Sequence, residues 1–90
     1  MKLSDRVRVP QDVLARQVGE EIVLLDLAKG VYYGLDPIGA RMWQLLVEGN
    51  ALTHVCEVMM NEYEVSRSDL ERDLLRLVEE LAANALVGPA

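Results

Sequence analysis

Near its middle, the sequence passes from a strand pattern to a helix pattern with no linker between the two. Residues 22–27 and 31–35 are rich in branched aliphatic residues and tyrosine, and three residues ending in Gly30 separate them. Glycine at that position supplies the positive φ that a three-residue hairpin turn needs, so we expect a β-hairpin. Asp36 and Pro37 follow at once, an N-cap side chain before a residue suited to the first helical position. A helix therefore starts directly from the second strand of the hairpin.

Length and composition indicate one ordinary folded domain, spanning residues 1–90. Apolar residues make up 51% and charged residues 27% of the chain, and no apolar run approaches the roughly 20 residues of a membrane span. Residues 1–3 lead into a polar segment, so we expect no signal peptide and no membrane partner. The single Cys56 can form no internal disulfide, which favours a reducing compartment. We therefore expect a small cytoplasmic protein.

The composition opposes nucleic-acid binding, metal binding and catalysis. Nine basic and fifteen acidic residues give a net charge of −6, which disfavours contact with a phosphate backbone, so no nucleic acid is expected as partner. Cys56 lies at an apolar helical position and is interpreted as core, and His54 has no second ligand at metal-binding spacing. No acid–base pair or nucleophile constellation accompanies them. The sequence predicts a protein that is not an enzyme and carries no cofactor.

Strand signals fill the first third of the chain. Residues 1–11 lack periodicity and are interpreted as an extended lead-in, and residues 12–18 give a first strand closed by a tight turn. In residues 22–27 both alternating sets of side chains are apolar, which is typical of a strand covered on both faces or flanked on both edges. We place this strand at the centre of the sheet. Residues 31–35 then form an edge strand, with unpaired N–H and C=O groups unless another segment covers them.

Three helices are expected to follow the sheet. The first spans about residues 37–48. Its apolar stripe consists of Ile38, Met42, Leu45 and Leu46, with Trp43 beside them in the core. The second spans residues 53–63 with Thr53 as N-cap. The third spans about residues 67–83 and begins with a capping box, in which Ser66 precedes a carboxylate by three residues.

The third helix carries an apolar stripe that is wider than one packing contact requires. At 100° per residue the stripe spans about 160°. It consists of Leu70, Leu74, Leu77, Val78 and Leu81, widened by Leu75 and Ala82. One half can cover the core while the other half lines a groove. Charged residues edge the stripe, and Arg76 is expected to pair with Glu80 four residues later.

Three strands followed by three helices, with short connections, predict an α+β fold in which the helices pack on one face of a three-stranded antiparallel sheet. The same order suggests a winged helix-turn-helix, whose usual ligand is DNA. A third helix rich in Asp and Glu opposes that ligand, because it would present an acidic face to the phosphates. A DNA-binding transcription regulator and a structural subunit of an enzyme complex are the alternative functions.

The segment VLLDLAKGVYYGLDPIGARMWQLL, followed by a helix ending in NEYEV and a long helix ending in ALV, resembles the PqqD-like family. These proteins are recognition elements for ribosomally made, post-translationally modified peptides (RiPPs). The resemblance covers about residues 7–87 and is closest to the discrete proteins of lasso-peptide pathways. It implies a winged-helix-like domain without catalytic activity, which binds the leader segment of a precursor peptide as an added β-strand. It also implies delivery of the leader to a second partner, a modifying enzyme or a leader peptidase.

The resemblance places the leader between the third strand and the third helix. An exposed strand edge offers main-chain donors and acceptors to any extended peptide, while neighbouring side chains give sequence preference. Gly34 lacks a Cβ where a partner backbone would approach. The expected peptide-binding residues are Val31, Tyr32, Tyr33, Gly34, Leu35, Leu70, Asp73, Leu74, Arg76 and Leu77. The pattern leaves open which face of the strand lines the groove.

Overall fold

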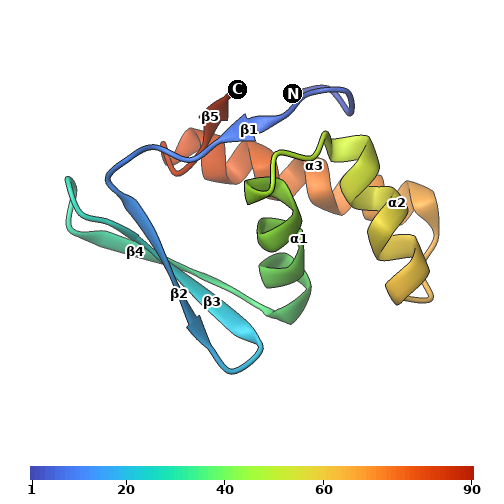
Figure 1. The fold of residues 1–90 in the computed structure, drawn as a ribbon, viewed down its shortest axis with the longest axis horizontal. Coiled ribbons are helices and arrows are strands. Elements are labelled where there is room, and N and C mark those ends of the chain that lie inside the picture. Colours follow the sequence, from blue (N-terminus) through green and yellow to red (C-terminus); the bar gives the residue numbers. More distant parts are fainter.

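The computed structural model describes residues 1–90, and Figure 1 shows a twisted sheet beside a group of three helices. The elements in chain order are β1 (Val7–Arg8), β2 (Val13–Val18), β3 (Glu21–Asp26), β4 (Val31–Leu35), α1 (Pro37–Val47), α2 (Leu52–Glu62), α3 (Arg67–Ala83) and β5 (Gly88–Pro89). The antiparallel sheet β2-β3-β4 followed by three helices confirms the predicted α+β fold, with β3 at the centre of the sheet.

Two tight hairpins join the three main strands. Gly19, at φ 64°, lies in the two-residue turn between β2 and β3. The predicted three-residue turn between β3 and β4 is wrong by one residue, since β3 ends at Asp26 and the loop has four residues. The buried Asp26 explains the earlier end, because its Oδ1 accepts hydrogen bonds from the amides of Ala28 and Lys29. Gly30 ends the loop at φ 69°, as the sequence predicted.

The two faces of the sheet differ in burial. Side chains of Ile22 and Leu24 on β3 turn toward the helices and are buried, whereas Val23 and Leu25 on the opposite face are partly exposed. The apolar residues on both faces of this strand therefore reflect its two flanking strands, and not helices on both faces. Tyr32 on β4 is 77% exposed on the same outer face.

The core lies between the inner face of the sheet and the helices. Asp36 caps α1 as predicted, because its Oδ1 accepts a hydrogen bond from the Gly39 amide at 2.8 Å. Trp43 and Cys56 are buried in the core, as the sequence predicted. Ile38, expected in the core stripe of α1, is instead 40% exposed, because it lies in the first turn of the helix beyond the reach of the core.

The start of α2 differs from the sequence prediction. Thr53 is not its N-cap; the helix begins at Leu52, and Ala51 occupies the cap position without a side-chain hydrogen bond. The lead-in supplies the missing acceptors, since the amides of Leu52 and Thr53 donate to the main-chain carbonyls of Asp5 and Leu3, at 3.0 and 2.8 Å. Residues 1–11 are therefore not uniformly extended, and their first turn is fixed against α2.

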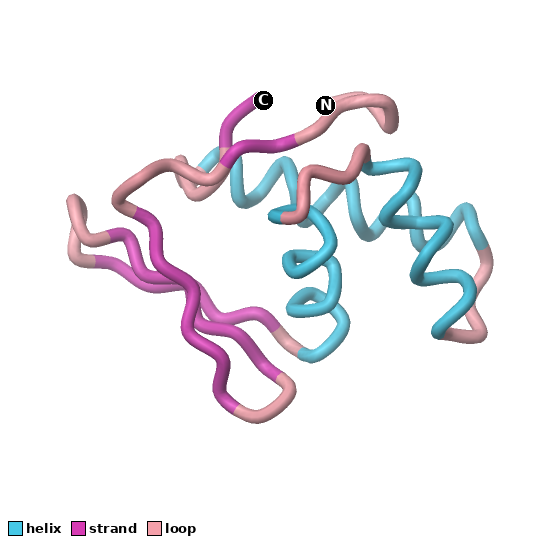
Figure 2. Tube along the Cα trace, in the orientation of Figure 1, coloured by secondary structure: helices cyan, strands magenta, loops and turns pink.

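Both ends of the chain meet in a second small sheet. Figure 2 shows β1 and β5 side by side above the helices, and β1 pairs antiparallel with β5. Leu86 and Val87 precede β5 and are buried, so the last apolar segment packs back on the core. This pairing brings β1 onto the same side of the molecule as the last turn of α1.

Candidate functional site

The free edge of β4 is the first feature of the candidate site. The Leu27 amide donates to the Asp12 carbonyl, which fixes the alternation of the ladder between β2 and β3. By the same alternation, Ile22, Leu24 and Asp26 direct their main-chain groups toward β4. Tyr32 and Gly34 therefore direct their own N–H and C=O groups away from the sheet. No strand of the chain pairs with this edge.

The side chains of β4 divide between two faces. Tyr33 and Leu35 turn inward; Leu35 is 3% exposed in the core, and Tyr33 is half-buried. Val31 shares that face but lies at the strand end and is exposed. Tyr32 and Gly34 turn outward, and a Cβ added at Gly34 would meet no atom within 4 Å. The inner face, with Tyr33 at its middle, is the one that turns toward α3.

The predicted apolar stripe of α3 serves two environments. Leu74 is fully buried and Leu70 is 5% exposed, so both belong to the core, although Leu70 also borders a surface hollow. Leu77 is partly exposed and lines a hollow that Asp73 shares. Since Leu74 reaches no hollow, the structure places it behind the groove and not on its wall.

Three hollows follow the length of α3: the first lies among the helices, the second at the end of β4 and the third at its start. The first, about 180 Å³ in volume, is lined by Ile38, Met59, Tyr63, Val65, Asp69, Leu70 and Asp73. The second, about 220 Å³, is lined by Asp36, Ile38, Gly39, Met42, Asp73 and Leu77. The third, about 160 Å³, is lined by Val31, Tyr32, Tyr33, Asn84 and Leu86. The start of β4 thus faces the end of α3, and the two elements run in opposite directions.

Tyr33 and Glu80 lie between the second and third hollows. Burial of the phenol, and secondarily its interaction with the Glu80 carboxylate, raises the pKa of Tyr33 to about 12. The hydroxyl therefore keeps its proton at physiological pH and can donate to a carboxylate or to a peptide carbonyl. This pair connects the middle of β4 to α3.

Ion pairs line the outer rim of the groove on α3. Arg72 contacts both Asp69 and Asp73, at 3.2 and 3.5 Å. Arg76 pairs with Asp73 at 3.4 Å, and not with Glu80 as predicted, because Glu80 turns toward Tyr33. These side chains are more than half exposed, so their pairs hold weakly and can exchange partners with a bound peptide.

Three further features of the chain concern metal binding, the reactivity of its thiol and membrane crossing. No group of three or more His, Cys, Asp or Glu residues is placed to hold a metal ion. Burial raises the pKa of the Cys56 thiol, which keeps it protonated and unreactive. None of the helices has the length and apolar character that crossing a membrane requires.

Several groove residues escaped the sequence prediction. Asp36 and Ile38 were interpreted only as a helix cap and a core residue, yet both line the hollow at the end of β4. The absence of a linker before α1 was the available signal, because it forces the first helical turn to lie beside the strand edge. At the other end of the groove, Asn84 and Leu86 line the hollow at the start of β4. The sequence predicts a helix stop at Asn84 and an apolar segment after it, but not that this segment turns toward β4.

Comparisons with known proteins agree on one family. Residues 21–87 match the family model described as coenzyme PQQ synthesis protein D (PqqD). The solved structure of TbiB1 in complex with the TbiA(beta) leader peptide is 36% identical, with a TM-score of 0.84 over 89% of this chain and 93% of that one. A lasso peptide synthetase B1 complexed with the leader peptide is 33% identical, with a TM-score of 0.86 over 93% and 99% of the two chains. No curated protein matches the chain.

Proposed function

This chain belongs to the PqqD family, and we propose that it is a non-catalytic module that captures the leader segment of a ribosomally made precursor peptide. Both similar solved structures contain a leader peptide, and both cover at least nine-tenths of their own length in the comparison. The proposed pathway type is that of lasso peptides. The proposed place of action is the cytoplasm, where precursor peptides are made.

The observation that carries the proposal is the unpaired edge of β4 beside a groove. A leader that adds antiparallel to β4 forms hydrogen-bonded pairs with Tyr32 and Gly34, whose main-chain groups have no partner in the free protein. Its chain then runs from the Asp36 end of the groove toward Asn84, in the direction of α3. Gly34 leaves the outer face open, which eases the approach of a second backbone.

Side chains of the added strand provide the sequence preference. Residues opposite each other in an antiparallel pair share a face, so leader side chains opposite Tyr33 and Leu35 point toward α3. There they meet Leu77 and the Tyr33–Glu80 pair, with the hollows at either end of the groove. Leader side chains opposite Tyr32 and Gly34 point to the outer face and remain available to another protein.

That other protein, in the proposed function, is the modifying enzyme or leader peptidase of the same pathway. The module itself contributes no reacting group, so it works by raising the local concentration of the precursor at the enzyme. Incubation of the purified protein with a precursor peptide should leave the mass of the peptide unchanged. No cofactor takes part in this function.

The experiment is a titration of ¹⁵N-labelled protein with the TbiA(beta) leader peptide and with the leader of the precursor encoded nearest to the chain's own gene. Binding at the proposed groove protects the amides of Tyr32 and Gly34 from hydrogen exchange, while the amides of Tyr33 and Leu35 are already bonded to β3. Tyr32→Pro removes one of the two main-chain donors and should weaken binding of the leader. Protection confined to β2, or binding of duplex DNA at low salt with no binding of either leader, would refute the proposal.

A further inference from the structure

The opposite edge of the sheet, along β2, is also free. The ladder alternation that directs Tyr32 and Gly34 outward on β4 directs the N–H and C=O groups of Ala15 and Gln17 away from β3. No strand pairs with this edge. Only Val13 of β2 is buried; Ala15 and Gln17 face the helix side of the sheet but are exposed. Strand β2 therefore lacks the cover that the other two strands have.

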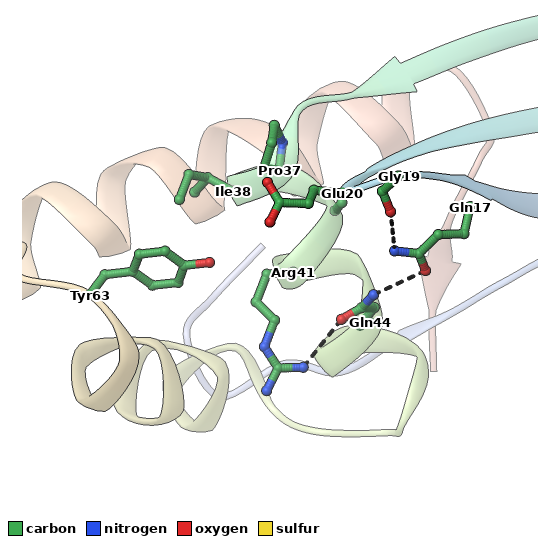
Figure 3. Close-up of a pocket in the computed structure, with 9 residues that line it drawn as sticks. Gln17, Gly19, Glu20, Pro37, Ile38, Arg41, Gln44 and Tyr63 are labelled. Atoms are coloured by element: carbon green, nitrogen blue, oxygen red, sulfur yellow. Dashed lines mark hydrogen bonds between the residues drawn. The ribbon is translucent and has the colours of Figure 1, made fainter.

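A groove made of two hollows lies between β2 and α1. Its larger hollow has a volume of about 580 Å³, and seven of its eight lining residues are apolar. They include Val7, Val9, Val13, Ala15, Trp43 and Val47. A second hollow of about 390 Å³ continues the groove toward the Gly19 turn. Figure 3 shows Gln17 and Gln44 pointing toward each other in this second hollow, with Gln44 donating to Gln17 at 3.4 Å.

The single charged side chain that lines the larger hollow is basic, in contrast to the net charge of the chain. The four arginines of the helices each lie within 4.0 Å of a carboxylate. Arg8, the one charged residue that lines this hollow, has no ionic partner, and neither has Arg16 on β2. The acidic residues nearest to them in sequence, Asp5, Asp12 and Glu20, form no ion pair with either. An occupant with a carboxylate is therefore favoured over one with a cation.

The same charges oppose a second copy of this chain as the occupant. Arg16 lies at the middle of β2 with its side chain exposed. Two copies that paired antiparallel through β2 would bring their Arg16 side chains close together, and like charges on neighbouring strands destabilise the pair. A different chain is required.

We propose that the groove between β2 and α1 is a second strand-addition site, which binds an extended segment of another protein with alternating apolar and acidic side chains. The apolar side chains enter the hollow against Trp43 and Val47, and the main chain pairs with Ala15 and Gln17. The carboxylates point to the opposite face of the added strand, where they lie beside the exposed Arg16. The sheet then holds two foreign strands at once, one on each edge. If this segment belongs to the enzyme that receives the leader, that assignment rests on the proposed function. The existence of the second binding site does not depend on it.

The probe is a capped octapeptide of alternating valine and glutamate, compared with one of alternating valine and lysine. Titrated into ¹⁵N-labelled protein, the glutamate peptide should shift the amides of Ala15 and Gln17 and the indole N–H of Trp43, and should bind more tightly than the lysine peptide. Arg16→Glu should weaken binding of the glutamate peptide by roughly fivefold and reverse the preference. Arg67→Glu, whose parent side chain pairs with Glu71 outside the groove, is the matched control and should change neither affinity.

Other outcomes separate this site from the leader site. With the TbiA(beta) leader peptide added, the shifts at Ala15 and Gln17 should persist while Tyr32 and Gly34 become protected. If the leader fails to bind and the octapeptide still binds at β2, the proposed function fails and the second site stands. The second site is overturned if the glutamate peptide gives no saturable shift at millimolar concentration, if its shifts are confined to β4, or if the leader displaces it from β2. It is also overturned if Arg16→Glu leaves the preference unchanged.

Discussion

Leu74 and Leu77 are three residues apart on α3 but lie in different environments, because Leu74 is fully buried and Leu77 lines the groove beside β4. The apolar stripe of this helix is thus shared between the core and a surface that a peptide can reach. A single helix can therefore support the fold with one row of side chains and select a ligand with the next. Alanine substitutions in each row can distinguish the two roles.

Leu74→Ala and Leu77→Ala should fall into different classes. Leu74→Ala leaves a cavity in the core and should cost about 2 to 5 kcal/mol of unfolding free energy, a large share of the stability of a small domain. Leu77→Ala removes a partly solvated side chain, so the melting temperature should change little while the affinity for a leader falls. Melting temperature and leader affinity are measured for both variants. Equal loss of stability and affinity in both would mean that Leu77 is core and that the groove lies elsewhere.

Asp26 should control the position of β4 through the hairpin loop. Its carboxylate is 5% exposed and accepts from two loop amides, at 3.0 and 3.2 Å. Asp26→Ala leaves both amides without this acceptor and should lower stability by about 1 to 3 kcal/mol. Asp26→Asn keeps one carbonyl oxygen and should lie between the wild type and the alanine variant. Chemical denaturation gives the free energy of unfolding of all three proteins. If Asp26→Ala leaves this free energy unchanged, the loop holds its shape without the aspartate.

The parts of the fold that depend on neighbouring residues could be predicted from the sequence. Asp36 and Ser66 cap their helices as expected, since a cap is a contact between residues three apart. The start of α2 could not be predicted, because its amides are satisfied by carbonyls of Leu3 and Asp5, which are distant in sequence. Residue preferences alone predict Thr53 as the N-cap, because threonine is common at that position. In the structure its hydroxyl instead accepts a hydrogen bond from Arg67.

The candidate site could be predicted only in part from the sequence. The edge position of β4 follows from the order of the strands, but the partner of Glu80 does not. Helical spacing gave Arg76 as that partner, whereas the folded chain places Tyr33 beside Glu80 and leaves Arg76 with Asp73. The β2 groove was not predicted, since it depends on which of several apolar residues the helices leave uncovered.

Substitution of Arg76 should change the affinity for a leader and not the stability of the fold. Its side chain is 68% exposed and pairs with Asp73 at 3.4 Å, so Arg76→Glu should change the melting temperature by little. A reversed charge at the groove rim should alter leader affinity and its dependence on salt, because exposed charges act through a screened field. Arg67→Glu on the same helix, away from the groove, is the control. Identical salt dependence in wild type, Arg76→Glu and Arg67→Glu would remove Arg76 from the site.

The last prediction concerns the only ion pair that joins α1 to α2. Arg41 binds both carboxylate oxygens of Glu62, at 2.8 and 2.6 Å, and this contact lowers the pKa of Glu62. A carboxyl whose pKa is depressed by folding stabilises the protein above its ordinary pKa of about 4.3 and loses that contribution as the pH falls through the lower folded value. Both side chains are about a third exposed, so the contribution is on the order of 0.5 to 1 kcal/mol.

Glu62→Gln should therefore lower the melting temperature at pH 7, and the difference from the wild type should shrink as the pH is lowered below the ordinary pKa of glutamate. Glutamine cannot carry the charge, so the variant lacks this titration while every other carboxyl of the chain keeps its own. Glu64→Gln, two residues further along and without an ion pair in the structure, is the matched control and should follow the wild type at every pH. Thermal melts of the three proteins between pH 3 and pH 7 test the sign directly. A difference that stays constant down to pH 3, or that grows as the pH falls, would show that Glu62 stabilises the helix pair by packing and not by its charge.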